Sequence, residues 1–514
     1  MYHCQIAQSE QALEDIARLN YETFVEEIPQ HPRNTSGLLV DKFHSQNTYL
    51  VMYHEHTLIA MVAFRDQRPF SLDGKIGAVE AHLPQQVCER LCEIRLLAVK
   101  KNYRQSFVFL RLAQALYSHV LHQSYSACVI SGTTRQKKLY ERIGFQAFAP
   151  VVGTKDASFI PMVLTMQQAH EFHAPFLQRQ KVFYPGPVQQ KAPLKHTTLS
   201  HRSPSFVHLL AQVKRQLLNL SQAQNVAVFQ GSGTLANEMM LQQLKSRHAQ
   251  ELGLICSNGA FGQRLIEQAT QLGLNFDTYQ CHWTEAFDAP TLMRLSQGKT
   301  WLLAVHGETS SGQLNDLSAL IACKKQHRLT LALDCISSFG ACEFSLQEVD
   351  LASATSGKAI GALAGLGCVF YQDTPCDSSN TVYANLAHYH HHVPYTLPAY
   401  LLDNVHQALQ QYPQRFELLQ QRLQQVLHCE ALVGDKVAIP QHYPTAITFQ
   451  WRPEKAHSAM LNGLLLHHHS AYLQQRQWVQ ISVIQPYFED DFESLLKWHE
   501  YWAQHQHLES LPNV

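Results

Sequence analysis

The sequence lacks several features that would place a chain in a specialised class. It has no apolar run of 18 residues, which a membrane-spanning helix needs, and its first ten residues, MYHCQIAQSE, lack the basic and apolar regions of a signal peptide. It also lacks an excess of charge of either sign, because its formal net charge is -1. We therefore expect no membrane contact and no nucleic-acid partner.

A disulfide framework is also missing. The twelve cysteines are scattered, mostly inside apolar runs, and no C-x-x-C pair occurs. This pattern predicts reduced, buried thiols and a cytoplasmic protein. Histidine is frequent, with 31 residues, and clusters at positions 388–392 and 467–469. No Cys, Asp or Glu completes a ligand set beside either cluster, so we predict no metal site.

The length and composition indicate an ordinary globular protein of more than one domain. The chain has 514 residues, of which 45% are hydrophobic and 16% charged. A chain of this length exceeds what one hydrophobic core supports, so two or three domains are expected.

One lysine stands alone in a small-residue stretch. Residues 353–367 read SATSGKAIGALAGLG, and Lys358 is the only charge between Asp350 and Asp373. In apolar surroundings the pKa of a lysine falls, so that its neutral amine can attack an aldehyde. Asp334 ends the apolar run LTLALD, 24 residues earlier. A pyridoxal phosphate (PLP) site needs this pair: the lysine forms the Schiff base, and the aspartate keeps the ring nitrogen protonated.

The N-terminal third has the pattern of a compact α/β unit. Alternating apolar runs predict strands, and apolar positions at a 3.6-residue spacing predict helices. The predicted helices cover 9–24, about 110–121 and 135–143, with Gly144 as the last stop signal, and the predicted strands cover 48–53, 57–65, 92–99 and 126–132.

These residues resemble a known fold. Tyr103–Arg104 after a strand, then a long helix, a strand and the sequence KLYERIGF at 138–145 are similar to the GNAT acyltransferases. In that family an R-x-x-G-x-G/A loop holds the pyrophosphate of coenzyme A (CoA) with backbone N–H groups. Here the loop reads RQSFVF, with Phe107 and Phe109 in place of the glycines. This departure argues against ordinary acetyl-CoA binding.

Other stretches are similar to the autoinducer-synthase branch, which takes long acyl groups, often from acyl carrier protein. They are YETFVEEI at 21–28, DKFH followed by NTYLV, and Glu93 with Arg95 on one strand. The resemblance implies an acyl-CoA or acyl carrier protein thioester as donor. It also implies Tyr140 as general acid for the leaving thiolate and Glu93 as base or acceptor anchor. A packed aromatic ring and an ion pair with Arg95 are the structural alternatives.

From about Val182 the pattern changes to short apolar runs separated by longer amphipathic ones. The runs are NVAVF, GLIC, WLLAV, LTLAL and GCVFY, and each ends in polar or glycine residues. Such runs predict a parallel sheet covered by helices on both faces. Function in these sheets collects at the carboxyl ends of the strands.

The motifs at these ends resemble one family. In order they are PGPV, SHRS, GSGT, SNGAFGQR, HGETSSG, DCISSFGA and SGKAIG, and together they are similar to class V PLP-dependent aminotransferases of the alanine–glyoxylate and 2-aminoethylphosphonate kind. The resemblance implies PLP fold type I, an α/β architecture with a parallel-rich seven-stranded sheet and a small C-terminal domain, in a homodimer. The predicted division is a GNAT-like domain at 1–168, a linker at 169–181, the large PLP domain at 182–410 and the small domain at 411–514.

The resemblance also implies roles for individual residues. Ser232, Gly233 and Thr234 bind the phosphate, Phe261 stacks on the ring, Thr309 lies near the ring hydroxyl, Asp334 pairs with the ring nitrogen, Lys358 carries PLP, Thr396 reaches the neighbouring subunit's phosphate, and Gly186 and Gln480 contact substrate. Gly357 departs from the family, which has Gln or Asn before the lysine, so one cofactor contact is expected elsewhere.

Gln480 departs from the family in a way that concerns the substrate. It occupies the place of an arginine that binds the substrate α-carboxylate. Either another arginine, such as Arg202 or Arg476, replaces that arginine, or the amino substrate lacks a free α-carboxylate, as an ester, amide, acylated or phosphonate compound does. The sequence favours the second explanation, because an acyl-transfer domain is attached.

The sequence thus predicts a bifunctional enzyme, a PLP aminotransferase for a small amino compound fused to an acyltransferase that acts on a related amine. Two alternatives remain open at this point. In the first alternative, the N-terminal domain is a non-catalytic module that binds acyl carrier protein or CoA. In the second, the PLP part is a lyase or desulfurase. A desulfurase needs a reactive cysteine on a loop after the lysine, for which only Cys376 qualifies, because Cys368 lies in a strand.

Overall fold

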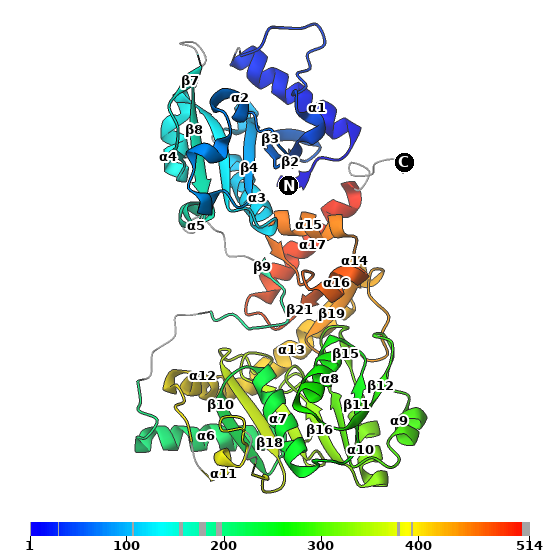
Figure 1. The fold of residues 1–514 in the computed structure, drawn as a ribbon. Helices are drawn as coiled ribbons and strands as arrows, with labels where there is room; N and C mark the ends of the chain where they lie inside the picture. The colour runs from blue at the N-terminus through cyan, green and yellow to red at the C-terminus, as the bar shows by residue number, and fades with distance from the viewer. Residues whose placement is uncertain are drawn as a thin grey trace. The chain divides into compact units, whose positions relative to one another are not determined.

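A computed structural model describes the chain at residues 2–28, 30–104, 107–153, 158–173, 181–191, 198–377, 381–391 and 394–505 (Figure 1). Its internal contacts divide it into two units, which are treated separately below. Unit 1 comprises Met1–Lys181, Glu454–Leu465 and Glu493–Val514, and unit 2 comprises Val182–Pro453 and Leu466–Phe492.

Unit 1 contains a mixed eight-stranded sheet in the order β1-β2-β3-β4-β5-β8-β6, with β7 paired to β8. The strands are β1 (Tyr2–Ile6), β2 (Thr48–His54), β3 (Thr57–Arg65), β4 (Leu91–Val99), β5 (Ala127–Thr133), β6 (Gln146–Ala147), β7 (Val152–Gly153) and β8 (Ser158–Thr165). Strands β4 and β5 run parallel but pair only from Leu91 to Glu93 on β4. Beyond Glu93 they diverge, and Leu96 adopts a left-handed φ of 51° where β4 shifts register against β3.

The sheet packs with the α-helices α1 (Glu10–Tyr21), α2 (Asp73–Ile76), α3 (Val108–His122), α4 (Lys137–Ile143) and α5 (Met166–His173). Among them, α1, α3 and α4 lie where the sequence predicts helices, whereas α2 and α5 were not predicted. Ser9 caps α1 by accepting a hydrogen bond from the backbone N of Ala12 at 3.1 Å. Gly144 ends α4 with a left-handed φ of 104°. The GNAT-like mixed α/β fold predicted for the N-terminal third is confirmed.

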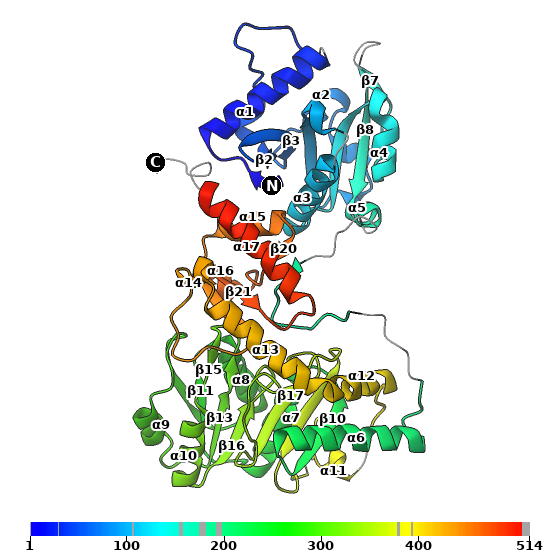
Figure 2. The same ribbon diagram turned by 180° about the vertical axis from the view of Figure 1, so that it is seen from behind.

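Segments from the end of the chain complete unit 1. Helix α15 (Pro453–Leu461) contributes Met460 to a core that also contains Cys4, Leu50 and Leu112. Figures 1 and 2 show α15 beside α3. The side-chain amide of Asn462 donates to the backbone O of Cys4 at 2.9 Å and accepts from its N at 3.1 Å. Because an apolar face of α15 is buried here, residues 454–465 belong to unit 1, which corrects their predicted place in the small domain at 411–514. The boundary between a large and a small domain near 410 stays a prediction.

Helix α17 (Phe488–His505) and strand β9 (Lys181–Val182) also join late segments of the chain to unit 1. On helix α17, the Tyr501 hydroxyl donates a hydrogen bond to the backbone O of Glu55 at 3.1 Å. Strand β9 pairs with β20 (Leu464–Leu465). The predicted linker at 169–181 therefore begins inside α5 and ends in a strand, while residues 174–180 lie outside the described residues.

Unit 2 contains a seven-stranded sheet in the order β10-β18-β17-β16-β13-β11-β12. The strands are β10 (Asn225–Gln230), β11 (Gly253–Ser257), β12 (Phe276–Gln280), β13 (Trp301–Val305), β16 (Thr330–Asp334), β17 (Leu351–Thr355) and β18 (Leu366–Tyr371). The predicted parallel-rich seven-stranded sheet is confirmed, although the sequence did not single out β18, which is antiparallel to both neighbours. The reason is the short connection at 356–365, which has no crossover helix to return the chain to the other end of the sheet.

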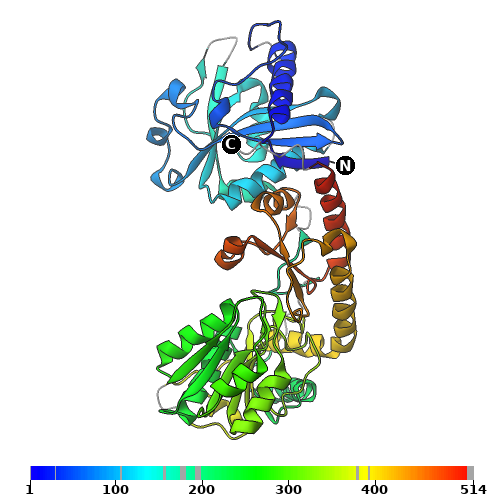
Figure 3. The same ribbon diagram turned by 90° about the vertical axis from the view of Figure 1, so that its right-hand side faces the viewer.

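Helices lie on both faces of this sheet, as the continuous apolar strands predict (Figure 3). Val226 and Val228 face a core shared with α6, α9, α10 and α12, whereas Ala227 and Phe229 face a core shared with α7 and α8. The helices are α6 (Pro204–Ser221), α7 (Gly233–Arg247), α8 (Ala260–Leu272), α9 (Ala289–Leu295), α10 (Leu317–His327), α11 (His388–His391) and α12 (Ala399–Gln410).

The remainder of unit 2 is smaller. It contains α13 (Tyr412–Leu427), α14 (Glu430–Val433), α16 (Ala471–Arg476), the antiparallel pair β19 (Ala446–Gln450) and β21 (Trp478–Ser482), and the short pair β14 (Gly307–Glu308) and β15 (Gln313–Leu314). Among the described residues, no helix is both long enough and apolar enough to cross a membrane.

The packing of α15 yields the first prediction. Met460→Ala should destabilise unit 1 by about 2–5 kcal/mol, because it removes a buried side chain from the core that contains β1 and β2. Hydrogen exchange of the full chain should then accelerate at Tyr2–Ile6 and Thr48–His54 and remain unchanged at Gly253–Ser257. Leu418→Ala, at a side chain 37% exposed on α13, is the control. Unchanged exchange at β1 in the Met460 variant would contradict the role of α15.

Candidate functional site

A cavity of about 520 Å³ lies at the carboxyl ends of the strands of unit 2. Its lining comes from the turn after β10, the start of α8, the ends of β13 and β16, and the connection between β17 and β18. The sequence-predicted residues in this lining are Gly186, Ser232, Gly233, Thr234, Phe261, Thr309, Asp334 and Lys358. Eight of the predicted residues, from six separate stretches of the chain, therefore meet at one site.

Lys358 lies in this cavity on the connection between β17 and β18. Its Nζ donates a hydrogen bond to the backbone O of Pro185 at 2.8 Å. Burial lowers the pKa of Lys358 to about 8, and the Asp334 carboxylate raises it in part. About half of the amine is therefore neutral and nucleophilic near pH 8, and the direction of this pKa shift is the one that the isolated position of Lys358 predicts.

Asp334, at the end of β16, is only 4% exposed and is held at both oxygens. One oxygen accepts from the side-chain amide of Asn237 at 2.7 Å, and the other accepts from the backbone N of Ile336 at 2.9 Å. Asn237 in turn accepts from the Ser353 hydroxyl at 2.6 Å. Burial raises the pKa of Asp334, and the hydrogen bonds and Lys358 lower it in part. The site thus presents a fixed carboxylate suited to a cationic partner.

The turn after β10 leads into the first turn of α7. Ser232 is the N-cap, and its hydroxyl accepts from the backbone N of Leu235 at 3.3 Å. A Cβ at Gly233 would lie 2.7 Å from the Ile336 side chain, so the close approach requires glycine there. The free N–H groups of a helix N-terminus attract anions, and this terminus faces the cavity through Thr234.

Phe261 and Thr309 line the cavity on either side of a buried acid. The carboxylate of Glu308, with no exposed surface, accepts from the backbone N of Phe261 at 3.3 Å and of Gly262 at 3.0 Å. It also accepts from the hydroxyl of Ser310. Glu308 therefore fixes the start of α8, which carries Phe261, and its buried position raises its pKa against the effect of these bonds. Sequence reasoning missed this role, although the acid stands in the HGETSSG motif.

Two glycines let the backbone approach the lysine. Gly186 has a φ of 137°, and a Cβ there would lie 2.9 Å from Nζ of Lys358. A Cβ at Gly357 would lie 2.7 Å from that of Ala364. The departure from the family's Gln or Asn at 357 therefore has a steric reason, because the loop folds back on itself at this point.

Two predicted residues lie outside the cavity lining. Gln480 is completely buried, and its amide donates to the backbone O of Thr309 and to the Thr448 hydroxyl, while its oxygen contacts His467 Nδ1 at 2.9 Å. With these groups already bonded, Gln480 supports the cavity wall and does not contact the lumen, which corrects the predicted substrate contact. Thr396 is exposed, and its contact with a neighbouring subunit stays a prediction.

Arg264 is the cation of this cavity that sequence reasoning missed. It lines the cavity with its guanidinium 5.1 Å from the centre of the Phe261 ring. The two arginines that the sequence offered as replacements do not line the cavity. Arg202 is exposed, and Arg476 lies over the ring of Trp283 at 3.7 Å. Arg264 is the last residue of the SNGAFGQR motif, and this position on the first turns of α8 could have pointed to a place in the cavity lining.

Unit 1 has a cavity of about 160 Å³ where β4 and β5 diverge. Its walls are mainly apolar, with Leu112, Leu116 and Phe109 from the α3 side, and Tyr140 lies among the lining residues. The ring of Tyr140 would be 2.9 Å from a Cβ at Gly132, so the glycine makes room for it. Of the RQSFVF loop, Phe107 is 78% exposed, and residues 105 and 106 lie outside the described residues.

Glu93 does not line this cavity, which corrects its predicted role as base or acceptor anchor. The carboxylate is fully buried and accepts from the backbone N of Ser71 at 2.8 Å, the Ser71 hydroxyl at 2.6 Å and the backbone N of Leu72 at 3.1 Å. Arg95 approaches it at 3.8 Å but forms a closer bidentate pair with Asp41. The acid therefore holds the loop that follows β3.

The histidine clusters form no metal centre in the described part of the chain, where no group of three or more His, Cys, Asp or Glu side chains is placed to hold an ion. His467 is engaged by Gln480 and Ser470, and His392 lies outside the described residues.

Comparison with known proteins assigns both units. A family model described as aminotransferase class V matches residues 189–383, and one described as N-acyl amino acid synthase FeeM matches residues 15–166. The chain belongs to the class V aminotransferases, a PLP-dependent family, and the part ahead of the aminotransferase is similar to the N-acyl amino acid synthase FeeM over residues 15–166. The chain is therefore an enzyme, as its sequence predicts.

The individual relatives agree with this assignment. The 2-aminoethylphosphonate–pyruvate transaminase of Pseudomonas putida strain W619 is 31% identical over 252 residues, which are 46% of this chain and 68% of the relative. Among solved structures, an aspartate aminotransferase from Thermus thermophilus is similar in fold, with a TM-score of 0.55 and 20% identity over 62% of this chain and 98% of its own. A ureidoglycine–glyoxylate aminotransferase from Bacillus subtilis has a TM-score of 0.55 and 18% identity over 64% of this chain and 94% of its own.

The lowered pKa of Lys358 yields a prediction about reactivity. In the protein freed of cofactor, the rate of Lys358 acetylation by acetic anhydride should rise with pH and level off above about 8, since only the neutral amine reacts. At pH 8 about half of this amine is neutral, against roughly one in 250 for an ordinary lysine. Mass spectrometry of peptides measures both, with the exposed Lys138 as internal control.

Asp334→Asn should lower the Lys358 pKa further, because the carboxylate opposes the effect of burial. If Lys358 and Lys138 titrate together, the desolvated environment of Lys358 is wrong.

Proposed function

We propose that unit 2 carries out transamination with PLP held at Lys358. One observation carries the proposal: Lys358, the fixed carboxylate of Asp334 and the N-terminus of α7 line a single cavity. These are the three groups that PLP requires, namely an amine for its aldehyde, an anion for its ring nitrogen and N–H donors for its phosphate.

The residues divide the work in this proposal. PLP, when bound, supplies an aldehyde that takes up the amino group and a ring that accepts electrons. Asp334 holds a proton on the ring nitrogen, and Ser232 to Thr234 hold the phosphate. Phe261 packs on the ring, and Lys358 moves the proton at the substrate carbon that bears the amino group. Thr309, whose backbone is tied to Gln480, lies near the ring hydroxyl.

We propose that the amino substrate is a small amine that carries a phosphonate in place of an α-carboxylate. Arg264 is an exposed guanidinium in the cavity, suited to a bidentate contact with a tetrahedral anion. Gln480 supplies no charge at the place of the family's carboxylate-binding arginine. The relative named above acts, by its name, on 2-aminoethylphosphonate and pyruvate, which is consistent with both points.

We propose that unit 1 transfers an acyl group to such an amine. The apolar cavity between β4 and β5 suits a long acyl chain, delivered as a thioester of CoA or acyl carrier protein. The amine nitrogen bonds to the acyl carbon, the carbon–sulfur bond breaks, and Tyr140 gives its proton to the sulfur while the amine releases a proton to solvent. The product is an amide. Transamination in the amine-forming direction would supply the acceptor, and fusion raises its effective concentration.

Three further predictions belong to this proposal. A homodimer is expected, with Thr396 reaching the partner's cofactor phosphate. A reducing, cytoplasmic location is supported by the twelve cysteines, all in described segments and all free of disulfides. A desulfurase is disfavoured, because no cysteine is among the residues that line the Lys358 cavity; Cys368 is buried in β18 and Cys376 lies outside that lining.

The role of Arg264 is tested by its neutral variant. Arg264→Gln should raise KM for 2-aminoethylphosphonate by roughly 10- to 100-fold, because it removes a charge-assisted contact worth about 1.5–3 kcal/mol. Turnover at saturation should change little. Arg202→Gln, which removes an exposed arginine outside the cavity, is the matched control. A larger effect from Arg202 than from Arg264, or a strong preference of the wild type for alanine, would refute this substrate.

Acyl transfer is tested with the full chain, 2-aminoethylphosphonate and a set of acyl-CoA thioesters from two to sixteen carbons, without a keto acid that would consume the amine. Mass spectrometry should detect N-acyl-2-aminoethylphosphonate with long chains and little with acetyl. Tyr140→Phe should lower its formation by roughly 100-fold or more, since the general acid is lost while the ring remains.

Tyr103→Phe, at a tyrosine of unit 1 outside the cavity, should not affect the rate. Full activity of Tyr140→Phe would remove Tyr140 from the mechanism. Binding of long thioesters without any amide product would favour the non-catalytic module.

A further inference from the structure

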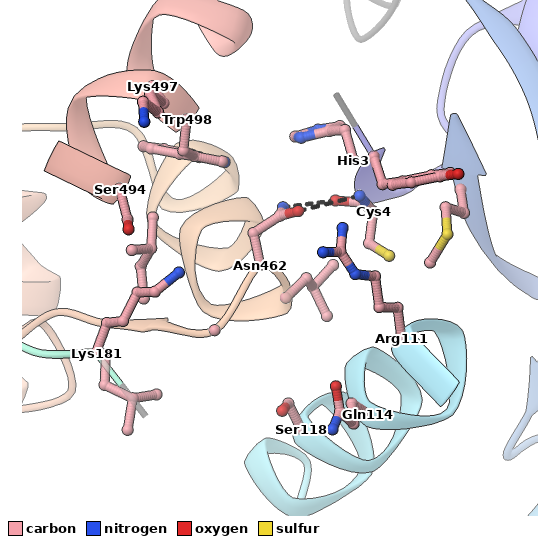
Figure 4. Close-up of a pocket in the computed structure, with 16 residues that line it drawn as sticks. His3, Cys4, Arg111, Gln114, Ser118, Lys181, Asn462, Ser494, Lys497 and Trp498 are labelled. Carbon is pink, nitrogen blue, oxygen red and sulfur yellow. Dashed lines mark hydrogen bonds between the residues drawn. The ribbon is translucent and has the colours of Figure 1, made fainter. Parts of the chain in front are cut away.

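A second cavity in unit 1, of about 430 Å³, lies on the opposite face of α3 from the acyl cavity (Figure 4). Arg111, Gln114 and Ser118 line it, one helical turn apart, whereas Leu112 and Leu116 of the same helix line the acyl cavity. The two cavities are therefore separate sites, and neither family motif in the sequence accounts for the second.

The walls of this cavity are joined by specific hydrogen bonds. Asn462 links the turn after α15 to β1 through both backbone groups of Cys4, as Figure 4 shows. The backbone N of Lys181 donates to the O of Gly463 at 3.3 Å, which fixes β9 against the same turn. Because strand, turn and β9 are tied together, the cavity has a defined shape and is part of the folded unit.

The lining carries three cations from three segments and no acid. Arg111 comes from α3, Lys181 from β9 and Lys497 from α17. In Figure 4 the Arg111 guanidinium and the Lys181 amine point toward the space beside Asn462 from opposite sides. This concentration of positive charge contrasts with the formal net charge of -1 for the whole chain. A cavity with such a lining attracts anions.

The charges of Arg111 and Lys497 are weakly compensated within the described residues. Arg111 forms no ion pair in that part of the chain. Its guanidinium contacts the Tyr2 ring, 5.2 Å from the ring centre. Lys497 pairs with Glu493 one turn earlier on α17, but both side chains are more than half exposed. An exposed pair of this kind contributes little free energy, so Lys497 can exchange its partner for a ligand.

The chemistry of the lining points to a phosphorus oxyanion with an organic part. Guanidinium, ammonium and the Ser118 hydroxyl donate hydrogen bonds to phosphate oxygens, and a dianion gains more than a carboxylate from several cations. The volume exceeds that of a phosphate group alone. The rest of the lining is largely apolar and includes Tyr2, Met52 and Leu465, which suits a short alkyl or aryl group.

We propose that this cavity binds a small organic phosphate or phosphonate. Its tetrahedral dianion lies among Arg111, Lys181 and Lys497, and its organic part contacts Tyr2 and Met52. The inference does not depend on the reactions proposed for the two active sites, because none of these residues belongs to either of them.

The test uses isothermal titration calorimetry on the PLP-loaded full chain with phenyl phosphate, phenylphosphonate and benzoate as probes. The first two differ as ester and phosphonate, and benzoate offers the same ring on a carboxylate. The wild type should bind one or both phosphorus probes at least tenfold more tightly than benzoate. Arg111→Gln with Lys497→Gln should weaken that binding by roughly tenfold or more, because two charge-assisted contacts are lost.

Two control variants separate loss of the cavity's charge from a general loss of positive charge. Arg135→Gln with Lys138→Gln removes the same charges from exposed positions of unit 1 outside the cavity and should bind as the wild type does. Arg111→Lys keeps the charge and should retain most of the affinity. Hydrogen exchange at β1 checks that the double variant is folded.

Three outcomes would overturn the proposal. They are no binding of either phosphorus probe, binding of benzoate with equal affinity, and binding that survives in the Arg111/Lys497 variant but is lost in Arg264→Gln. The last outcome would place the ligand in the unit 2 cavity.

Discussion

Burial of the Asp334 carboxylate at the end of β16 is the constraint on which the unit 2 site depends. A carboxylate that is 4% exposed is costly to bury unless its oxygens are bonded, and here Asn237 and the backbone N of Ile336 bond both of them. Asn237 is fixed in turn by Ser353 on the neighbouring strand. The arrangement gives the acid a single position, and it is accompanied in the same cavity by Lys358, whose pKa burial lowers to about 8.

The residues around Asp334 and Lys358 are also held by close packing and hydrogen bonds. The connection that carries Lys358 is tight because Gly357 packs on Ala364, and Gly186 lets the chain pass directly beside the amine. Glu308, a second buried acid, fixes the first turn of α8, which carries Phe261 and Arg264. Each buried polar group is thus bonded to a residue that positions another member of the site. Such pre-organisation is what a cofactor enzyme contributes besides the chemistry of its cofactor.

Unit 1 is built from more than the N-terminal part of the chain. Residues 454–465 lie far along the chain, yet Met460 and Leu461 belong to the same core as Cys4 and Leu50. Unit 1 therefore depends for its own core on segments that follow the unit 2 sheet in the sequence. The cationic cavity lined by Arg111, Lys181 and Lys497 exists because these segments return.

Much of this could be predicted from the sequence, where local patterns decide the outcome. The isolation of Lys358, the position of Asp334 after an apolar run and the glycine stop at Gly144 are properties of short stretches. The fold class and the order of most strands and helices followed from such patterns. The direction of β18 was missed because it depends on the shortness of the connection that precedes it.

The remaining misses depended on long-range packing. Glu93 was taken for a catalytic group, but its oxygens hold Ser71 and Leu72, which lie 22 and 21 residues away. Gln480 was predicted to contact the substrate, yet only its partners Thr309 and Thr448 reveal that it is turned away from the lumen. The return of α15 to unit 1 has no local signal, because an apolar helix face does not specify its partner.

The most direct test of the account is to identify the lysine that carries PLP. Reduction of the PLP-loaded protein with borohydride makes the bond between the cofactor and its lysine permanent, and the modified peptide can then be identified by mass spectrometry. The account predicts one modified lysine, Lys358, and loss of the modification in Lys358→Ala. A modified peptide that maps to any other lysine, or a protein that retains no PLP under these conditions, would contradict it.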